Sequence, residues 1–493
     1  MPRREALHYL KQHESCFNLF GDGARFLQMH GKGQPREMNV FRLNLIDEAG
    51  TTLFDGHIQP GGRLSREELA VALVAYQSFA AMGKTGGSEP SPKGRLRKDG
   101  KIKMEPQGGQ AALCRDGAAL HAFMVQPNLR ESILWNLATK RQLDGVGLVT
   151  WNEESKPVWE YRATRLDALP ETKLKTDYLA RLVPAARSVW LHENLQTAES
   201  ANGVQYGVFA GSKDQKTKKE KPGTGIREPS ASLQLDKAKK STQSAYKLVS
   251  ASAGDGVPKA VWRELHSITV LRHAGKAGGP LALEHLRSMQ VRDARLWCGA
   301  LVGDQAKVGD VVESSFVLPV SMLEDADAAT HEDAKKCPGP NRTYRLGVGL
   351  ANGFAGRLQF AVQDYFQCYD PRDPKKKRKD RADSMKKLRQ QKANAAATRF
   401  WTALEQKAES VLLRDVAVSS GKYWSGDGNW LARSPWGKEV FRAAKDAYDF
   451  ACPHETSRQL RAYAAGLRVL FREKSSAVEA AKDDTGDDDS DQI

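Results

Sequence analysis

Residues 350–365, LANGFAGRLQFAVQDY, carry apolar side chains at offsets 0, 4, 8, 11 and 15, the spacing of one face of an α-helix. Three later stretches repeat this period. Their apolar positions are Phe400, Leu404, Ala408 and Val411; Trp436, Val440, Ala444, Ala447 and Tyr448; and Leu460, Ala464, Leu467 and Phe471. Four helices with one apolar stripe each bury those stripes against one another. The sequence therefore predicts a four-helix bundle over residues 346–475.

The chain before the bundle mixes helical and extended patterns. Ser65 and Glu68 form a capping box, which predicts a helix whose apolar face carries Leu69, Leu73 and Tyr76. Short β-like runs at 204–209 and 314–320 follow. We therefore predict an α+β protein with an irregular mixed α/β domain over residues 1–345.

Two long segments of this first part have loop composition. Residues 83–109 are rich in Gly, Pro and cations, and residues 211–228 contain five lysines. Both are too polar to be buried, so we expect surface loops.

Charge is distributed unevenly over the 493 residues. Lys and Arg number 75 against 60 Asp and Glu, a net charge of +15. Residues 482–493 alone carry six Asp and one Lys, so the rest of the chain is +20. This excess indicates polyanionic partners, and the acidic tail, residues 476–493, is expected to be disordered.

Several classes of protein are disfavoured. The six Cys are far apart and form no CxxC pair, which argues against a disulfide framework and a zinc cluster. The start of the chain has no signal-peptide pattern, and no run of 18 apolar residues exists. We expect a cytoplasmic protein that does not enter a membrane.

Catalytic signatures are weak as well. His192, His331 and His454 each precede a Glu, but none is followed by the second His of an HExxH motif. Asp304 and Asp310 fit metal ligands and surface turns equally well. We therefore predict neither enzymatic activity nor a cofactor.

The densest basic run is 375–379, KKKRK. It resembles a nuclear localisation signal, but it also fits a solvated connection between two bundle helices, the reading we favour, or a phosphate-contacting patch.

Three other segments combine small and cationic residues: a glycine loop at 83–87, a lysine-rich segment at 236–240, and a predicted hairpin at 301–308 with Gly303 at its turn. Taken singly, each fits an ordinary loop, a lysine surface or a hairpin at least as well.

Read in order, these segments resemble the large subunit of the type I-E CRISPR surveillance complex Cascade (the CasA family). The segments that carry the resemblance span about residues 17–472. They are FNLF at 17–20, RFLQ at 25–28, NLRESILWNL at 128–137, VWREL at 261–265, DQAK at 304–307, RFWTALE at 399–405 and SRQLRA at 457–462.

The resemblance implies a non-catalytic role in RNA-guided DNA surveillance. Such a subunit finds the short motif beside a DNA target, opens the duplex there and helps to recruit the helicase-nuclease. Its implied partners are the other Cascade subunits, the CRISPR guide RNA, double-stranded target DNA and the helicase-nuclease.

The resemblance also assigns residues. Those implied to contact DNA are Gly83, Gly86 and Gly87 of the glycine loop, Lys237 or its neighbour Lys239 as the groove-entering lysine, and Gln305 as the wedge, flanked by Asp304, Ala306 and Lys307.

Two features depart from the family pattern. The family usually opens with strands and helices ahead of the FNLF segment, whereas this chain begins close to it. Some relatives carry a Cys-rich metal insertion; the corresponding region here has no Cys, so we expect no zinc. Two other functions also fit parts of the sequence: a stand-alone metal-dependent nuclease, and a general RNA- or single-strand-binding protein.

Overall fold

The computed structural model divides the chain into two compact units, Met1–Val317 and Leu318–Ile493. It describes residues 2–31, 35–44, 62–79, 89–90, 104–105, 120–146, 149–204, 209–210, 225–226, 229–235, 246–248, 260–272, 278–304, 307–325, 337–369 and 378–471. The division falls before residue 345, where the change in sequence period suggested a boundary. Residues just after strand β13 pack on the first bundle helix, where the Asn341 amide donates to the Met322 carbonyl oxygen at 3.4 Å.

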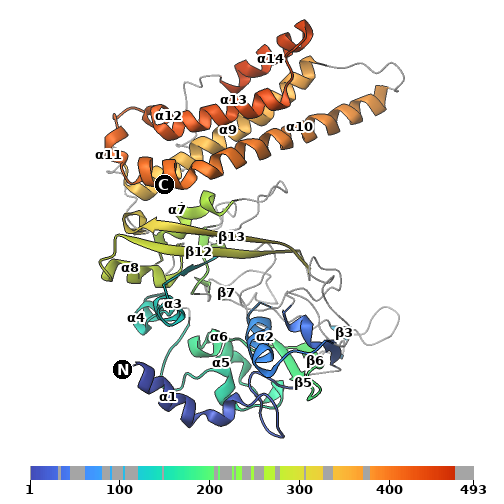
Figure 1. Cartoon of the computed structure of the whole chain (residues 1–493), viewed down its shortest axis with the longest axis vertical. Coiled ribbons are helices and arrows are strands. Elements are labelled where there is room, and N and C mark those ends of the chain that lie inside the picture. The colour runs from blue at the N-terminus through green and yellow to red at the C-terminus, as the bar shows by residue number, and fades with distance from the viewer. Residues whose placement is uncertain are drawn as a thin grey trace, which may run out of the picture. The chain divides into compact units, whose positions relative to one another are not determined.

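The first unit contains short helices, mostly short strands and the two long strands β12 and β13 (Figure 1). Its α-helices are α1 (Pro2–Gln12), α2 (Arg66–Phe79), α3 (Leu129–Asn136), α4 (Lys140–Val146), α5 (Glu171–Thr176), α6 (Tyr178–Leu182), α7 (Leu265–Ile268) and α8 (His285–Ser288). Its strands are β1 (Arg36–Asn39), β2 (Glu89–Pro90), β3 (Met104–Glu105), β4 (His121–Met124), β5 (Arg187–Leu191), β6 (Thr197–Asn202), β7 (Phe209–Ala210), β8 (Gly225–Ile226), β9 (Leu233–Leu235), β10 (Tyr246–Leu248), β11 (Val270–Leu271), β12 (Asp293–Asp304) and β13 (Lys307–Pro319).

Two three-stranded sheets organise this unit. One has the order β1-β6-β5 and the other β13-β12-β4. Two-residue ladders join β2 to β3 and β7 to β8. The segment at 83–109, expected to be a loop, therefore contains the β2–β3 pair. The segment at 211–228 contains β8, which pairs with β7 just before this segment. The polar composition did not reveal these strands.

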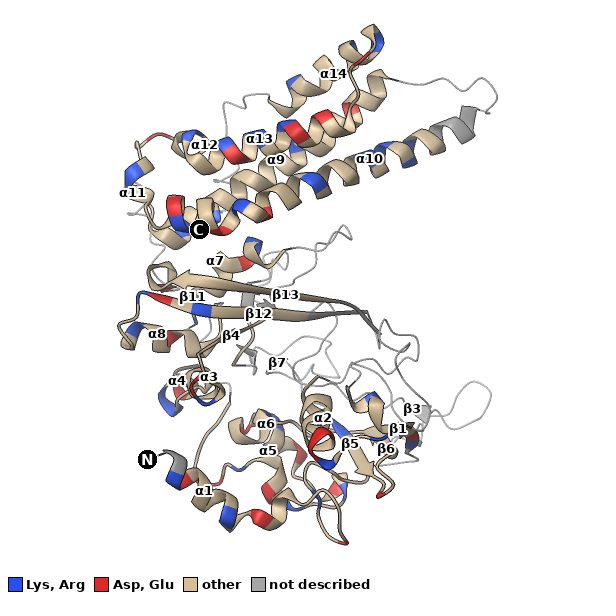
Figure 2. Cartoon of the chain, viewed as in Figure 1, with Lys and Arg blue, Asp and Glu red and all other residues tan. Residues whose placement is uncertain are grey.

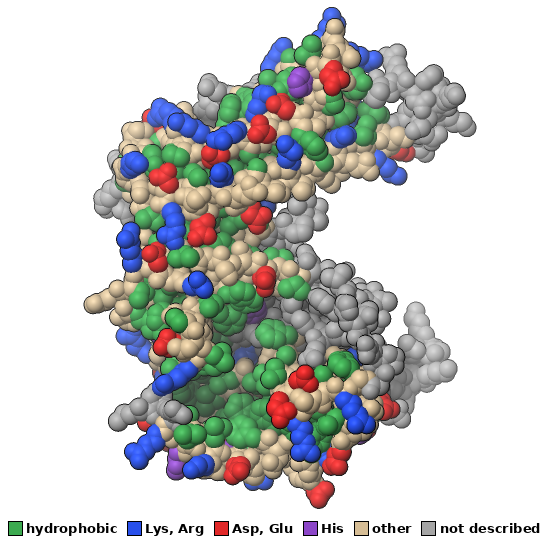
Figure 3. Space-filling model, viewed as in Figure 1, with side chains coloured by type: hydrophobic (Ala, Val, Ile, Leu, Met, Phe, Trp, Pro, Cys, Tyr) green, Lys and Arg blue, Asp and Glu red, His purple; other side chains and the backbone are tan. Residues whose placement is uncertain are grey.

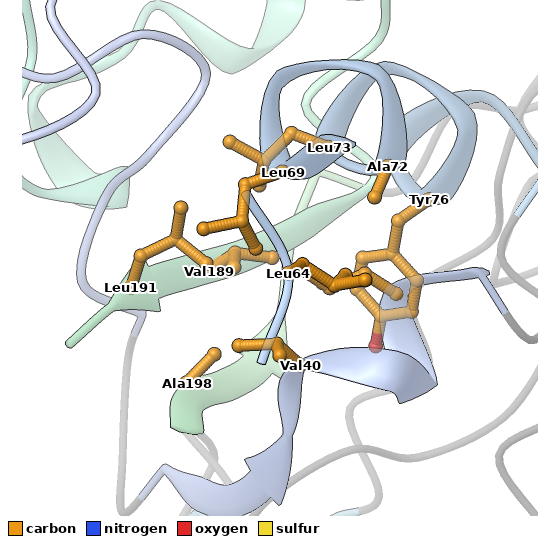
Figure 4. Close-up of a cluster of buried hydrophobic side chains, with 10 residues drawn as sticks. Val40, Leu64, Leu69, Ala72, Leu73, Tyr76, Val189, Leu191 and Ala198 are labelled. Carbon is orange, nitrogen blue, oxygen red and sulfur yellow. The ribbon is translucent and has the colours of Figure 1, made fainter. Parts of the chain in front are cut away.

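Helix α2 buries the apolar face that its sequence pattern predicted, and it packs this face on the β1-β6-β5 sheet. The capping box is present: the Ser65 backbone N–H donates to the Glu68 carboxylate at 2.7 Å, and the Glu68 N–H donates to the Ser65 hydroxyl at 3.2 Å. Leu69, Leu73 and Tyr76 are buried in one apolar cluster. Figure 4 shows this cluster, in which the α2 side chains meet those of β5 and β6. The cluster comprises Val40, Leu43, Leu64, Leu69, Ala72, Leu73, Tyr76, Val189, Leu191 and Ala198.

The second unit is dominated by helices, as predicted. Its elements are β14 (Glu324–Asp325), α9 (Pro340–Cys368), α10 (Arg378–Lys407), a π-helix (Ala408–Ala417), α11 (Ser420–Tyr423), α12 (Trp430–Arg433), α13 (Pro435–Ala451) and α14 (Ser457–Leu470). Helix α9 packs against α10, α13 and α14, and α10 packs against α13, so the four long helices form a bundle (Figure 1).

The predicted apolar stripe is buried throughout in α13, and in α9 at every position except Leu350, which is partly exposed. The prediction fails at two further places. In α14, Leu460 is 50% exposed and Ala464 is exposed, whereas Ala462, Gly466 and Leu470 are buried. The small residues let the α14 backbone approach α9, because a Cβ on Gly466 would lie 2.5 Å from the Ala361 carbonyl oxygen. Two small residues and Leu470 thus form the buried face of α14, and Leu460 does not belong to it.

The second failure lies after α10. The sequence placed Val411 in the buried stripe, but Leu412 and Leu413 are fully buried while Val411 is only partly so. Here the backbone adopts π-helical geometry, in which hydrogen bonds span five residues and each turn is wider than in an α-helix. The wider turn moves the buried face along the sequence.

Among the described residues, no helix combines the length and the apolar character needed to span a membrane. The acidic tail beyond Phe471 lies outside the described residues, and its expected disorder stays a prediction.

Candidate nucleic-acid interface

Most of the residues expected to contact DNA lie outside the described part of the chain. These are Gly83, Gly86, Gly87, Lys237, Lys239, Gln305 and Ala306. Asp304 and Lys307 are described only as backbone, at the ends of two strands. The elements that precede and follow the predicted site residues are described, and they show how each segment is anchored.

Gln305 and Ala306 connect two long neighbouring strands. Strand β12 extends to Asp304, β13 starts at Lys307, and the two strands are hydrogen-bonded neighbours in one sheet (Figure 1). The segment at 301–308 therefore belongs to a β-hairpin, as predicted. Gly303 is a residue of β12 and not of the turn, which corrects the sequence expectation.

The two candidate lysines also follow a paired strand. Strand β9 ends at Leu235, and β10 pairs with it in antiparallel register, Tyr246 opposite Leu235. Lys237 and Lys239 thus fall in the connection between two antiparallel strands. Both the lysine segment and the glutamine segment are carried by antiparallel strand pairs.

Strand β4 links these two strand pairs. Along one edge, its residues Met124 to His121 pair with Leu296 to Gly299 of β12. Along the other, His121 forms an antiparallel bridge with Ala231, which lies two residues before β9. The Ser232 N–H donates to the Leu120 carbonyl oxygen at 2.9 Å, and the Ala122 N–H donates to the Ser230 carbonyl oxygen at 3.2 Å. Strand β4 therefore holds together the strands that flank both candidate DNA-contacting segments in the sequence.

Helix α2 is the described element that precedes the glycine loop, and it ends at Phe79, four residues before Gly83. Gln77, in its last turn, is fully buried. Its amide group donates to the carbonyl oxygens of Arg187 at 2.8 Å and Leu27 at 3.1 Å, and its oxygen accepts the Arg187 N–H at 2.9 Å. These bonds tie the end of α2 to β5.

Gln77 was not singled out from the sequence, and neither was Asn136. The Asn136 side chain exchanges two hydrogen bonds with the Met124 backbone, each 2.8 Å long, and so fixes α3 to β4. Asn128 caps the same helix by accepting the Glu131 N–H at 2.9 Å. In the sequence, Gln77 is an amide residue in a largely apolar helical stretch, and this pattern could have identified it. The stretch around Asn136 is half polar and gave no such signal.

The first two segments that resemble the family, FNLF at 17–20 and RFLQ at 25–28, pack against other parts of the first unit. Phe17 and Phe26 approach each other and Trp159, with ring centroids 5.5 to 6.3 Å apart. The Arg25 guanidinium lies 4.2 Å from the Trp190 ring and donates to the Leu191 carbonyl oxygen at 3.0 Å. Aromatic and cation–π contacts of this kind stabilise the N-terminal segment against β5.

A hollow of about 280 Å³ lies beside β5 and β6. His30, Arg165 and Glu199 line it, and the His30 ring stacks on Trp190 with centroids 4.0 Å apart. Within the described part of the chain, no three His, Cys, Asp or Glu residues are grouped so as to hold a metal ion.

The basic run at 375–379 falls between α9 and α10, with Arg378 and Lys379 as the first residues of α10. Residues 375–377 lie outside the described residues. Further cations recur along α10 (Figure 2). The run therefore covers the end of the connection between two bundle helices and the start of α10, the place that the favoured interpretation gave it. Its exposure to solvent stays a prediction.

The fold matches solved structures of one class of CRISPR-associated proteins. A crystal structure of CasA from Thermus thermophilus aligns over 94% of this chain and 81% of its own length, at 18% identity and a TM-score of 0.60. Cse1 from Thermobifida fusca aligns over 94% and 82%, at 17% identity and a TM-score of 0.58. Cse1 from Acidimicrobium ferrooxidans aligns over 94% and 81%, at 18% identity and a TM-score of 0.55.

The fold is thus that of the CasA/Cse1 proteins. The model of the family CRISPR-associated protein Cse1 matches residues 1–447, and the chain belongs to this family. The resemblance to the type I-E Cascade large subunit is confirmed. No curated protein sequence matches the chain.

Proposed function

We propose that this chain recognises the short motif beside a DNA target from the minor groove, opens the duplex there and helps to recruit the helicase-nuclease. It does so as a non-catalytic subunit bound to the other Cascade subunits and the guide RNA. The observation that carries this proposal is the link through β4: the strands that precede and follow Gln305 are joined by one strand to the segment that leads to Lys237.

The residue types fit the proposed steps. The minor groove presents a degenerate set of acceptors, which an ammonium group and backbone N–H groups can contact with relaxed base specificity. A side chain inserted between base pairs costs a few kcal/mol of unstacking, and the contacts made to the opened duplex offset that cost. Gln305 is the proposed wedge, and Lys237 or Lys239 the proposed groove contact.

A rigid support is needed for such a wedge. If the hairpin could move freely, contact with the duplex would displace the hairpin and leave the base pairs stacked. The long β12–β13 pair, held on β4, supplies that support. The glycine loop would bring backbone N–H groups near the same DNA, because residues without a side chain allow close approach. Sequence beyond the motif would be read by guide pairing, as in other RNA-guided effectors.

The test uses the reconstituted complex and a duplex with 2-aminopurine next to the motif. Gln305→Ala should reduce the fluorescence rise that reports duplex opening by about tenfold, corresponding to ~1.4 kcal/mol. Lys237→Ala and Lys239→Ala together should weaken motif-dependent binding before opening. Ser315→Ala, an exposed position on β13, is the matched control and should behave as wild type.

Wild-type opening and binding by the Gln305 and lysine variants would refute the site assignment. Two further measurements separate this role from the other candidate functions. The purified chain should leave DNA uncut in Mg²⁺ or Mn²⁺, and the assembled complex should prefer motif-bearing duplex to random RNA. Omission of this subunit should reduce capture of the helicase-nuclease by the target-bound complex.

A further inference from the structure

A groove of about 500 Å³ runs between three helices of the second unit. Phe360 and Asp364 line it from α9, Lys386, Arg389 and Gln390 from α10, and Val469 from the last turn of α14. None of these residues belongs to the proposed DNA-contacting segments. The groove is therefore a separate feature of the helical bundle.

The lining combines an apolar surface with cations. The Phe360 side chain is 66% exposed, although it is a large aromatic group. The Arg389 Nε atom is buried and has no hydrogen-bond partner among the described residues. A charged donor in this state is stabilised by an acceptor that reaches it, and most strongly by a carboxylate.

The helix that contributes Lys386 and Arg389 to the groove is strongly basic in sequence. Residues 378–392 of α10 contain seven cations and two acids, a net charge of +5. Asp364 is the carboxylate among the lining residues named above. On the α13 side of the bundle, by contrast, cations and carboxylates are interspersed in the view of Figure 3. The groove thus fits an occupant that has acidic groups next to a small apolar stretch.

The sequence that follows α14 has this composition. Residues 477–481 read AVEAA, and residues 483–491 contain six Asp. Val469 lines the groove and lies fourteen residues before Asp483. Fourteen residues span at most about 50 Å when extended, far more than the few turns of α10 that line the groove.

We propose that residues 477–491 of this chain bind in this groove. The apolar residues Ala477 and Val478 cover the exposed ring of Phe360, and the Asp run supplies carboxylates to Lys386 and Arg389. Attachment to α14 makes the interaction intramolecular, which gives it a high effective concentration. The acidic segment thereby neutralises a basic face of the bundle.

Zero-length carbodiimide cross-linking of the full chain tests this proposal, because the reagent joins carboxylates to amines that are already in contact. Mass spectrometry should find Lys386 joined to Asp483–Asp491 in about tenfold higher yield than Lys407 or Lys438, which are exposed on the bundle away from the groove. The yield should fall several-fold between about 0.05 and 0.5 M NaCl, since salt screens exposed charges.

Variants of the full chain give the second arm. Arg389→Gln should reduce the Lys386 cross-links several-fold, whereas Lys407→Gln, the matched control on the same helix, should leave them unchanged. Thermal melting of both variants checks that the bundle is intact. Mixing ¹⁴N- and ¹⁵N-labelled chains distinguishes cross-links within one chain from cross-links between two copies. The proposal requires that both cross-linked peptides carry the same nitrogen isotope.

Three results would overturn the proposal. They are cross-links spread evenly over the lysines of the bundle, no cross-link from the acidic segment to Lys386, and mixed-isotope cross-links, which would identify a second copy as the occupant.

Discussion

The indole nitrogen of Trp436 donates a hydrogen bond to the carbonyl oxygen of Gly347 at 2.9 Å, between α13 and α9. Trp436 is fully buried, and Ser434 caps its helix by accepting the Gly437 N–H at 3.3 Å. A Cβ on Gly347 would lie 2.3 Å from a methyl carbon of Leu412 in the π-helix. Three helical segments therefore meet at this glycine.

We expect Trp436→Phe to lower the free energy of unfolding by about 1 to 3 kcal/mol, because it removes the hydrogen bond and leaves space beside Gly347. Chemical denaturation followed by circular dichroism measures this change. Trp401→Phe, on a partly exposed side of α10, provides the comparison and should cost less. Equal losses for the two variants would contradict the central role of Trp436.

Gly466 offers a sharper test of close helix packing. A Cβ there would lie 2.2 Å from the Tyr448 hydroxyl and 2.5 Å from the Ala361 carbonyl oxygen. We expect Gly466→Ala to destabilise the protein by about 2 kcal/mol or more, because backbone cannot move aside as a flexible side chain can. Gly353→Ala on α9 meets nothing within 4 Å and should stabilise by about 0.5 to 1 kcal/mol. Thermal melting of the two variants should shift in opposite directions.

Gln77 should stabilise the junction between α2 and β5. Gln77→Leu keeps the volume of the side chain but leaves the Arg187 N–H and two carbonyl oxygens without this partner, so we expect a loss of about 2 to 4 kcal/mol. Val71→Ala is the control on the same helix, because Val71 is 71% exposed. Hydrogen exchange at the Arg187 amide should accelerate only in the Gln77 variant. Unchanged protection there would argue against the assigned hydrogen bonds.

The described cysteines should differ in reactivity. Cys337 and Cys368 are exposed, whereas Cys16, Cys298 and Cys452 are buried. Burial raises the pKa of the Cys452 thiol to about 12, so its reactive thiolate is scarce at pH 8. Iodoacetamide at pH 8 should label Cys337 and Cys368 in the native protein, and the buried three only after unfolding. Rapid native labelling of Cys452 would show that the end of α13 opens locally.

The sequence by itself determined the elements whose signals are local. The capping box at Ser65, the stripe of α13 and the four-helix bundle follow from residue spacing, because a helix repeats its faces at a fixed interval. The hairpin over residues 301–308 was predicted from another local signal, the glycine expected at its turn. The family could also be inferred, since its segments occur in a fixed order along the chain.

Only the tertiary structure decided which faces meet. The sequence could not show that α14 packs through Gly466 and not through Leu460, or that a π-helix moves the buried position to Leu412. Nor could it show that β4 joins the strands beside Gln305 to those beside Lys237. These outcomes depend on the fit between segments far apart in the chain, and a local pattern holds no information about the shape of a distant partner.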